Sequence, residues 1–260
     1  MADLEFATSA DGTRIAFRRN GTGPRLVMVH GTTGSDWSFR FVEPLLSPSF
    51  TLYLMQRRGR GQSGDAPEYS LDREAEDVAA VVDATGGSAH VFGHSFGATL
   101  ALEASLLTRN VEKLVLYEPP VEFPYPEGSI EKLEQLAAKG SAEELLEEVF
   151  RAEGVLSSED LDALKGSPTW ADRVALAWTI PRESRAESWY SVSSERFASM
   201  PAPTLLLLGS DSGDAFRAGV ERVRSALPDV GVSILEGQGH AATMTAPELL
   251  AEEVTRFLLR

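Results

Sequence analysis

Ser95 stands in a sequence context that suits a nucleophilic hydroxyl. It is the centre of the pentapeptide Gly-His-Ser-Phe-Gly at 93–97, which follows a short apolar segment and precedes apolar residues at helical spacing. A strand that turns this sharply into a helix forces its central residue into strained dihedrals and brings two backbones close, which explains Gly93 and Gly97. The hydroxyl is then expected above the free N–H groups of the first helical turn. The pentapeptide alone would also fit a surface turn, but the flanking patterns favour a nucleophile elbow.

A serine hydroxyl needs a base within hydrogen-bond reach, and histidine is the most common one. The chain has four histidines. We expect His90 to be a structural strand residue, His94 to line a pocket or pack, and His30 to brace the loop after a buried strand. His240 ends a glycine-rich loop just after the last predicted strand, and the sheet order can bring that loop back over Ser95. The sequence therefore favours His240 as the general base.

The elements that must hold these residues follow a βαβ pattern. Segments 4–8 and 13–17 alternate polar and apolar residues and are joined by Asp11-Gly12, which favours an antiparallel hairpin. The apolar run at 25–31 is typical of a strand that helices cover on both faces. Further strands are predicted at 50–55, before Ser95, and at 112–118, 203–209 and 232–235; helices are predicted at 71–84, after Ser95, at 215–227, and from a capping-box motif at 245–248 onward. The fold class is therefore α/β, with a mostly parallel central sheet, helices on both faces, and ligands at the carboxyl ends of the strands.

Residues 121–202, which we call the cap, have a different pattern. Helical stretches are predicted at 130–139, 142–153, 170–179 and 185–197, and no buried strand stands out. We therefore expect a helical insertion over the sheet edge, between core segments 1–120 and 203–260. The aromatic residues of the cap suggest an apolar pocket, although packing within the lid would also explain them. These residues are Trp170, Trp178, Trp189, Tyr190 and Phe197.

The composition narrows the partners and the location. The chain has 260 residues, of which 43% are hydrophobic, enough for one core domain that carries an insertion. A net charge of −15 argues against nucleic acid and anionic membranes as partners, because both would repel it. Without cysteine, neither a disulfide framework nor a thiolate metal site is possible. No signal-peptide pattern or membrane-spanning run is visible, so we expect a cytoplasmic protein.

At this point the chain resembles the α/β-hydrolase family. The matching motifs are His-Gly-Thr at 30–32, Arg-Gly-Arg-Gly-Gln-Ser at 58–63, the pentapeptide at 93–97 and Gly-His at 239–240, each after a predicted strand. The resemblance covers the chain to about Pro120 and again from about Pro203. It implies that Ser95 is the nucleophile and His240 the general base, with the backbone N–H groups of Thr32 and Phe96 as the oxyanion hole.

The third member of the implied triad is less clear from the motif. The usual position of the carboxylate, three residues after the glycine that ends the seventh strand, holds Ser212, with Asp211 one residue before it. Some related enzymes place the acid at the end of the sixth strand, where Glu118 stands. We favour Glu118, because it sits at a rigid place before two prolines, whereas Asp211 lies in a flexible polar stretch; Asp211 is the alternative. A second departure is Gln56, where the family often has aspartate, at a position that braces a loop.

A serine nucleophile excludes the alkyl-ester chemistries of the same family, which use aspartate, and leaves acyl transfer. We expect a hydrolase without cofactor or metal that cleaves a small apolar ester, thioester or lactone through an acyl-enzyme. Carbon–carbon bond hydrolysis or a lyase reaction at the same site is one alternative. A receptor or signalling protein that keeps the hydrolase pocket is another. The sequence leaves the oligomeric state open between monomer and homodimer.

Overall fold

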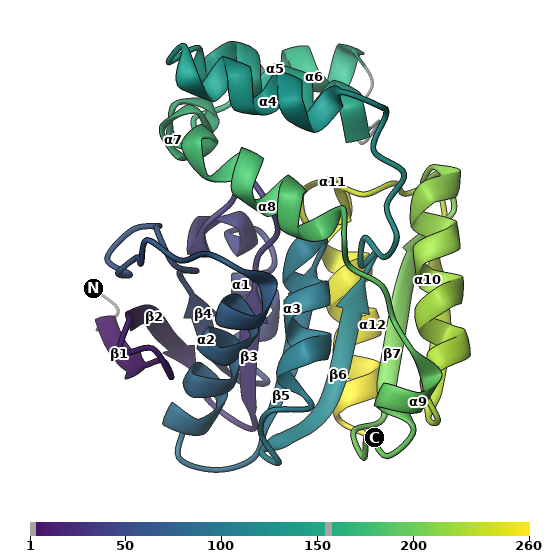
Figure 1. Cartoon of the computed structure of the whole chain (residues 1–260). Helices are drawn as coiled ribbons and strands as arrows, with labels where there is room; N and C mark the ends of the chain where they lie inside the picture. Colours follow the sequence, from purple (N-terminus) through teal and green to yellow (C-terminus); the bar gives the residue numbers. More distant parts are fainter. Residues whose placement is uncertain (1–3, 154–157) are drawn as a thin grey trace.

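The computed structural model describes residues 4–153 and 158–260, and these form one central sheet with helices around it (Figure 1). The described strands are β1 (Leu4–Thr8), β2 (Arg14–Gly21), β3 (Arg25–Val29), β4 (Thr51–Met55), β5 (Ala89–His94), β6 (Val111–Tyr117), β7 (Thr204–Gly209) and β8 (Val230–Leu235). Their order in the sheet is β1-β2-β4-β3-β5-β6-β7-β8. Both pairings of β2 are antiparallel and the others are parallel. The predicted α/β class with a mostly parallel sheet is confirmed.

Helices cover both faces of the central strands. Because successive strand residues point to opposite sides of the sheet, each of these strands contributes to two apolar clusters. Val27 and Val29 of β3 belong to one apolar cluster, with α2 (Leu71–Ala84), α3 (Phe96–Ala104) and α10 (Asp214–Ala226). Leu26 and Met28 belong to the other, with the 3-10 helix η1 (Asp36–Phe39), α1 (Glu43–Leu46) and α12 (Pro247–Leu258). In Figure 1, α2 and α3 lie in front of the sheet and α12 lies behind it.

Between β6 and β7, all the regular elements that the structure describes are helices. The elements are α4 (Ser129–Ala138), α5 (Ala142–Glu153), α6 (Ser158–Lys165), α7 (Trp170–Leu176), the 3-10 helix η2 (Ala177–Thr179), α8 (Ile180–Glu187) and α9 (Ser194–Phe197). Helices α4 to α8 lie over the carboxyl ends of the parallel strands (Figure 1). Helices α4 to α8 share an apolar cluster of their own, which includes Leu133 of α4, Leu146 of α5 and Ile180 of α8. Residues 154–157 of the predicted cap lie outside the described residues.

Two local predictions are wrong. The predicted helix at 185–197 is instead α8 and α9, separated by non-helical chain. Pro181 lies in the first turn of α8, where a missing N–H costs nothing, and so marks a helix start. The predicted capping box at 245–248 does not form, because Thr245 ends the short helix α11 (Ala242–Thr245) and its hydroxyl donates to Gln238 Oε1 (2.8 Å). No helix in the described part of the chain is long and apolar enough to cross a membrane.

Candidate active site

Ser95 lies at a sharp turn between β5 and α3, as the pattern predicts. Its φ and ψ are 56° and −131°, a strained conformation for a residue with a side chain. A Cβ atom at Gly93 would lie 2.5 Å from Cα of Ala98, and one at Gly97 would lie 2.4 Å from the carbonyl oxygen of Val29. Only glycine lets α3 approach β5 and β3 this closely. The hydroxyl of Ser95 makes no hydrogen bond with any described residue.

The imidazole of His240 pairs with Glu118 across the carboxyl ends of the sheet. The distance from Nδ1 of His240 to Oε2 of Glu118 is 2.6 Å. Glu118 is fully buried, and its Oε1 accepts hydrogen bonds from the N–H of Gly209 (2.8 Å) and from the hydroxyl of Ser212. Nδ1 of His240 is therefore occupied by a carboxylate, and Nε2 is left without a hydrogen bond to the described residues.

Asp211, the alternative acid, lies away from this pair. It is exposed; its carboxylate accepts from Ser210 Oγ (2.9 Å), and its backbone N–H donates to the carbonyl of Gln238 (2.9 Å). Ser212, which occupies the usual acid position, is buried and donates to Glu118 instead. Sequence reasoning identified that position but missed the role of the hydroxyl as a partner of the carboxylate. The serine at position 212 was itself the sequence signal for this role. A hydroxyl there cannot act as the acid and can only support a carboxylate from another part of the chain.

Aromatic rings hold the imidazole of His240 in place. The ring stacks on Phe216, with 4.1 Å between centroids and an interplanar angle of 18°, and lies 4.7 Å from the ring of His94. Burial lowers the pKa of His94 well below its ordinary value, so His94 is neutral and its Nε2–H donates to the carbonyl of His240 (2.9 Å). The Tyr117 hydroxyl donates to the carbonyl of Gly239. Phe216 and Tyr117 were not predicted as site residues, since each lies in an ordinary helix or strand pattern.

The candidate oxyanion donors lie beside the Ser95 turn. Phe96 is the first residue of α3, so its N–H has no acceptor within the helix. The N–H of Thr32 has no hydrogen-bond partner among the described residues. The next residue, Thr33, has a positive φ of 62°, and Arg173 holds it by donating from Nη1 to its carbonyl (3.1 Å) and its hydroxyl (2.8 Å). The loop that presents Thr32 is thus fixed from the cap.

His30 and Gln56 brace the loops on either side, as expected. Nδ1–H of His30 donates to the carbonyl of Gly31 (2.9 Å), and Nε2 accepts from the backbone N–H of Arg57 (3.3 Å). Burial lowers the pKa of His30 well below its ordinary value, which keeps the ring neutral and allows this acceptor role. Gln56 Oε1 accepts from the backbone N–H of Gln62 (2.8 Å). His90 is buried in β5, as a structural residue would be.

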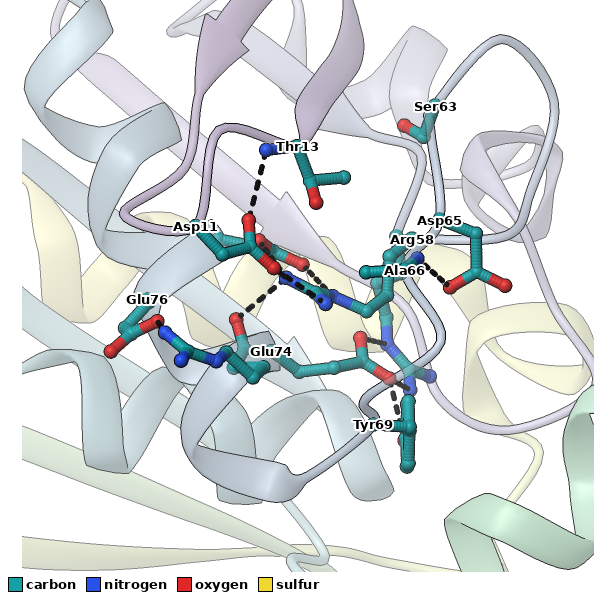
Figure 2. Close-up of polar contacts among 12 residues, drawn as sticks. Asp11, Thr13, Arg58, Ser63, Asp65, Ala66, Tyr69, Glu74 and Glu76 are labelled. Carbon is teal, nitrogen blue, oxygen red and sulfur yellow. Dashed lines mark hydrogen bonds and ion pairs between the residues drawn. The ribbon is translucent and has the colours of Figure 1, made fainter.

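Buried arginines anchor the loop after β4 to α2 and to the β1–β2 turn. Arg57 donates from Nε (2.8 Å) and Nη2 (2.5 Å) to Glu74 of α2. Arg58 pairs in the same way with Asp77, with an Nε distance of 2.6 Å, and reaches Asp11 in the β1–β2 turn (3.2 Å). Figure 2 shows the hydrogen bonds between Arg58 and Asp11, with Glu74 beside them. The loop is therefore rigid at the point where it meets the cap.

The same loop binds the cap through one carboxylate. Glu183 of α8 is fully buried and pairs with Arg60 and with Arg57, whose Nη2 lies 3.2 Å from Oε2. Burial would raise the pKa of Glu183, but the two guanidinium charges overcome it and hold the pKa below its ordinary value. Arg60 also donates to the hydroxyl of Thr179 (3.1 Å). Helix α8 is thus fastened to the core by buried ion pairs.

A small cavity of about 90 Å³ is shared by Ser95 and His240. The loop after β3, the Ser95 turn and the His240 loop form its core side, and Phe150, Leu164 and Arg173 come from the cap. None of the five aromatic cap residues is among the described residues that line this cavity, so of the two explanations that the sequence left open, packing holds for three of them. Trp178 and Trp189 are 49% and 80% exposed. The other three pack elsewhere: Trp170 against the cap cluster, and Tyr190 and Phe197 in the core cluster around α2, α3 and α10. Their side chains satisfy packing, which sequence position alone does not distinguish from pocket lining.

The described residues contain no group of three or more histidine, aspartate and glutamate side chains that could hold a metal ion.

Comparisons with known proteins agree with the fold. A model described as "Alpha/beta hydrolase family" matches residues 26–253. The solved structure of an alpha/beta hydrolase from Sphaerobacter thermophilus is 34% identical, with a TM-score of 0.86, over 97% of this chain and 99% of that chain.

Two curated relatives extend this similarity along most of the sequence. N-formylmaleamate deformylase from Pseudomonas putida is 29% identical over 89% of this chain and 88% of the relative. The 2-(acetamidomethylene)succinate hydrolase of Mesorhizobium japonicum is 26% identical over 93% of this chain and 90% of the relative. The likeness therefore spans the cap as well as the sheet.

Proposed function

Since the chain belongs to the alpha/beta hydrolase family, we propose that it is a serine hydrolase that cleaves a short-chain acyl ester, thioester or lactone through an acyl-enzyme on Ser95. One observation carries this proposal. The pair of His240 with the buried Glu118 and the hydroxyl of Ser95 meet at one cavity, beside the N–H groups of Thr32 and Phe96; neither the hydroxyl nor these N–H groups have a hydrogen-bond partner among the described residues. This combination supplies a nucleophile, a base, an orienting acid and an oxyanion site.

In the proposed reaction, Oγ of Ser95 attacks the carbonyl carbon of the substrate while Nε2 of His240 takes the hydroxyl proton. Glu118 accepts the Nδ1–H bond, which selects the tautomer with a free Nε2 and stabilises the imidazolium. The negative oxygen of the tetrahedral intermediate accepts hydrogen bonds from the N–H groups of Thr32 and Phe96, each worth on the order of 10²-fold or more in rate.

Collapse of the intermediate breaks the bond to the leaving group, which departs with the proton from His240. The acyl group is then held as an ester on Ser95. Water attacks that ester with His240 as base, a second tetrahedral intermediate forms, and its collapse releases the carboxylic acid and returns the proton to Ser95. The substrate, one water molecule and these side chains account for every atom and proton in the proposed reaction.

The size of the cavity limits the acyl group. At about 90 Å³ it is well below the roughly 300 Å³ or more of typical drug-sized ligand sites. A formyl, acetyl or other short acyl group suits this volume better than a long alkyl chain. The names of the two relatives, a deformylase and a hydrolase of an acetamido compound, also point to short acyl groups, borne there on nitrogen. Short N-acyl compounds therefore belong in the substrate panel.

The proposal is tested by labelling with a fluorophosphonate probe, followed by an ester and N-acyl panel of increasing chain length. We expect Ser95→Ala to lose labelling and at least about 10³-fold in kcat with little change in folding. Ser225→Ala, at a serine exposed on α10, should label like the wild type. Labelling that survives in Ser95→Ala would reject the nucleophile. Ligand binding without turnover of any panel member would favour the receptor alternative.

A further inference from the structure

One buried arginine lacks an acidic partner. Among the described residues four arginines are buried, and Arg57, Arg58 and Arg60 each form an ion pair with a buried carboxylate. Arg173 of α7 forms no ion pair with any described residue. Its polar contacts are the two bonds from Nη1 to Thr33, and its guanidinium lies 4.9 Å from the ring of Trp37.

The unused part of the group is a bidentate edge. Nε of Arg173 is buried without a hydrogen bond, and Nη2 has none to the described residues. Arg57 and Arg58 use this same Nε and Nη2 edge to hold Glu74 and Asp77. The edge matches a carboxylate geometrically, with two parallel N–H donors. In Arg173 this edge has no protein partner among the described residues, and the residue lines the cavity of Ser95.

A buried cation without a counter-ion is costly, so its position needs a reason. Burial, together with the nearby charge of Arg40, lowers the pKa of Arg173 to about 10, which still leaves it protonated at neutral pH. The chain has 39 acidic residues, yet none of the described residues that line the cavity shared by Arg173 and Ser95 is acidic. The cavity is thus a positive site in a strongly negative protein.

We propose that Arg173 binds a carboxylate of the substrate, so that the preferred substrates are short acyl compounds carrying a second, anionic group, such as monoesters or N-acyl derivatives of short dicarboxylic acids. The inference rests on the proposed hydrolase function and adds the substrate class. Attraction between the carboxylate and the guanidinium places the scissile carbonyl beside Ser95. Because the cavity is small, the carboxylate and the carbonyl must be only a few bonds apart.

A purely structural role for Arg173 is the competing explanation, since it holds Thr33 in the loop of the candidate oxyanion site. The two roles differ in their substrate dependence. Loss of a brace for Thr33 would slow neutral and anionic substrates equally. Loss of a carboxylate-binding group would slow the anionic substrate selectively.

The test compares monoethyl succinate with ethyl butyrate, which share the leaving group and the acyl chain length but differ in a terminal carboxylate. We expect the wild type to favour the anionic ester in kcat/KM, and Arg173→Gln to lower the anionic-to-neutral ratio by roughly 30-fold or more. Arg173→Lys, which keeps the charge but not the bidentate edge, should retain part of the ratio. The matched control is Arg40→Gln, which removes a nearby half-buried charge that does not line the cavity and should leave the ratio within about threefold.

An unchanged ratio in Arg173→Gln, or a wild type that prefers ethyl butyrate, would overturn the inference. If neither ester is cleaved, the ester-hydrolase proposal fails and calorimetry with succinate decides about Arg173 separately. Binding of succinate by the wild type that is lost in Arg173→Gln supports the carboxylate site. Equal binding by both proteins, or no binding by either, rejects it.

Discussion

Three residues around the site have positive φ angles that side chains rarely adopt. They are Thr33 (62°), Ser95 (56°) and Glu118 (48°). Each such conformation costs about 1–3 kcal/mol and persists only where the surrounding structure holds it. Here Arg173 holds Thr33 and the close approach of α3 holds Ser95, while Gly209 and Ser212 hold Glu118. The strain is thus concentrated in the groups that would touch or orient the reacting atoms.

The two candidate acids make opposite predictions when they are neutralised. Glu118→Gln removes the carboxylate that pairs with Nδ1 of His240, so we expect kcat to fall by roughly 10³ to 10⁴ while the fold is preserved. Asp211→Asn changes an exposed loop acid and should cost about tenfold or less. Both variants are assayed on one short ester at the same pH. The reverse ranking would assign the acid role to Asp211.

At the scale of elements, α8 joins the cap to the core through buried ion pairs. Its Glu183 is buried between Arg57 and Arg60 of the loop after β4. Helices α4 and α5 instead pack in the apolar cluster of the cap, and exposed ion pairs such as Arg185–Glu134 connect α8 with α4. We therefore expect the cap to open as a helical unit that remains anchored at α8, with the sheet intact.

Hydrogen exchange with a matched pair of variants tests this anchor. In the wild type, amides of α4 and α5 should exchange faster than those of β3 and β5, with α8 slower than α4 and α5. Glu183→Gln leaves two buried guanidinium groups short of a carboxylate, so we expect a loss of about 3–5 kcal/mol and faster exchange in α8. Glu134→Gln removes an exposed pair and should cost less than about 1 kcal/mol.

Either of two results would contradict this description of the cap. Equal protection in the cap and in β3 and β5 would mean that the insertion unfolds only with the core. Unchanged exchange of α8 in Glu183→Gln would mean that apolar packing, rather than the buried ion pairs, holds the helix.

At the scale of the whole molecule, the sheet could be predicted because its signals are local. Val27 and Val29 continue an apolar run, and Asp11-Gly12 marks a hairpin turn, so β1 and β3 were predicted close to their true bounds, whereas β2 continues to Gly21 beyond the predicted end at Phe17. Periodicity likewise gave α2 and α5 with the bounds that the structure has. The cap was harder, because the chain from 180 to 197 has mixed helical spacing and the stop after α8 carries no glycine or proline.

The residues of the candidate site were likewise predictable only where a local motif marks them. Ser95 and His240 stand in short motifs, whereas the link between Glu118 and His240 spans 122 positions and depends on the order of the strands. Arg173 carries no motif at all, since an arginine in an amphipathic helix most often faces solvent. Two features distinguish Arg173 from other arginines, its burial and the absence of an acid beside it among the described residues. Only the packed structure shows them.

Histidines whose pKa is lowered by burial make the stability of the whole molecule depend on pH, and the shifts are larger for His30 and His94 than for His90. Burial lowers the pKa of His30 and of His94 well below the value of about 6.5 that each has in the unfolded chain. Below about pH 6.5 the unfolded state binds protons that the native state does not, so stability is full above this pH and falls as the pH decreases. The limiting slope is about 1.4 kcal/mol per pH unit for each histidine.

Urea denaturation at pH 7.5, 6.5 and 5.5 measures this slope, and His94→Gln isolates one contribution. Glutamine keeps an N–H donor for the carbonyl of His240 but does not titrate, so the variant should lose less stability between pH 6.5 and 5.5 than the wild type. Burial raises the pKa of Asp77 to about 6, which acts with the opposite sign because the native state then binds the extra proton. Asp77 is present in both proteins, so its contribution cancels in the difference. Parallel curves for the two proteins would show that His94 titrates equally in the native and unfolded states.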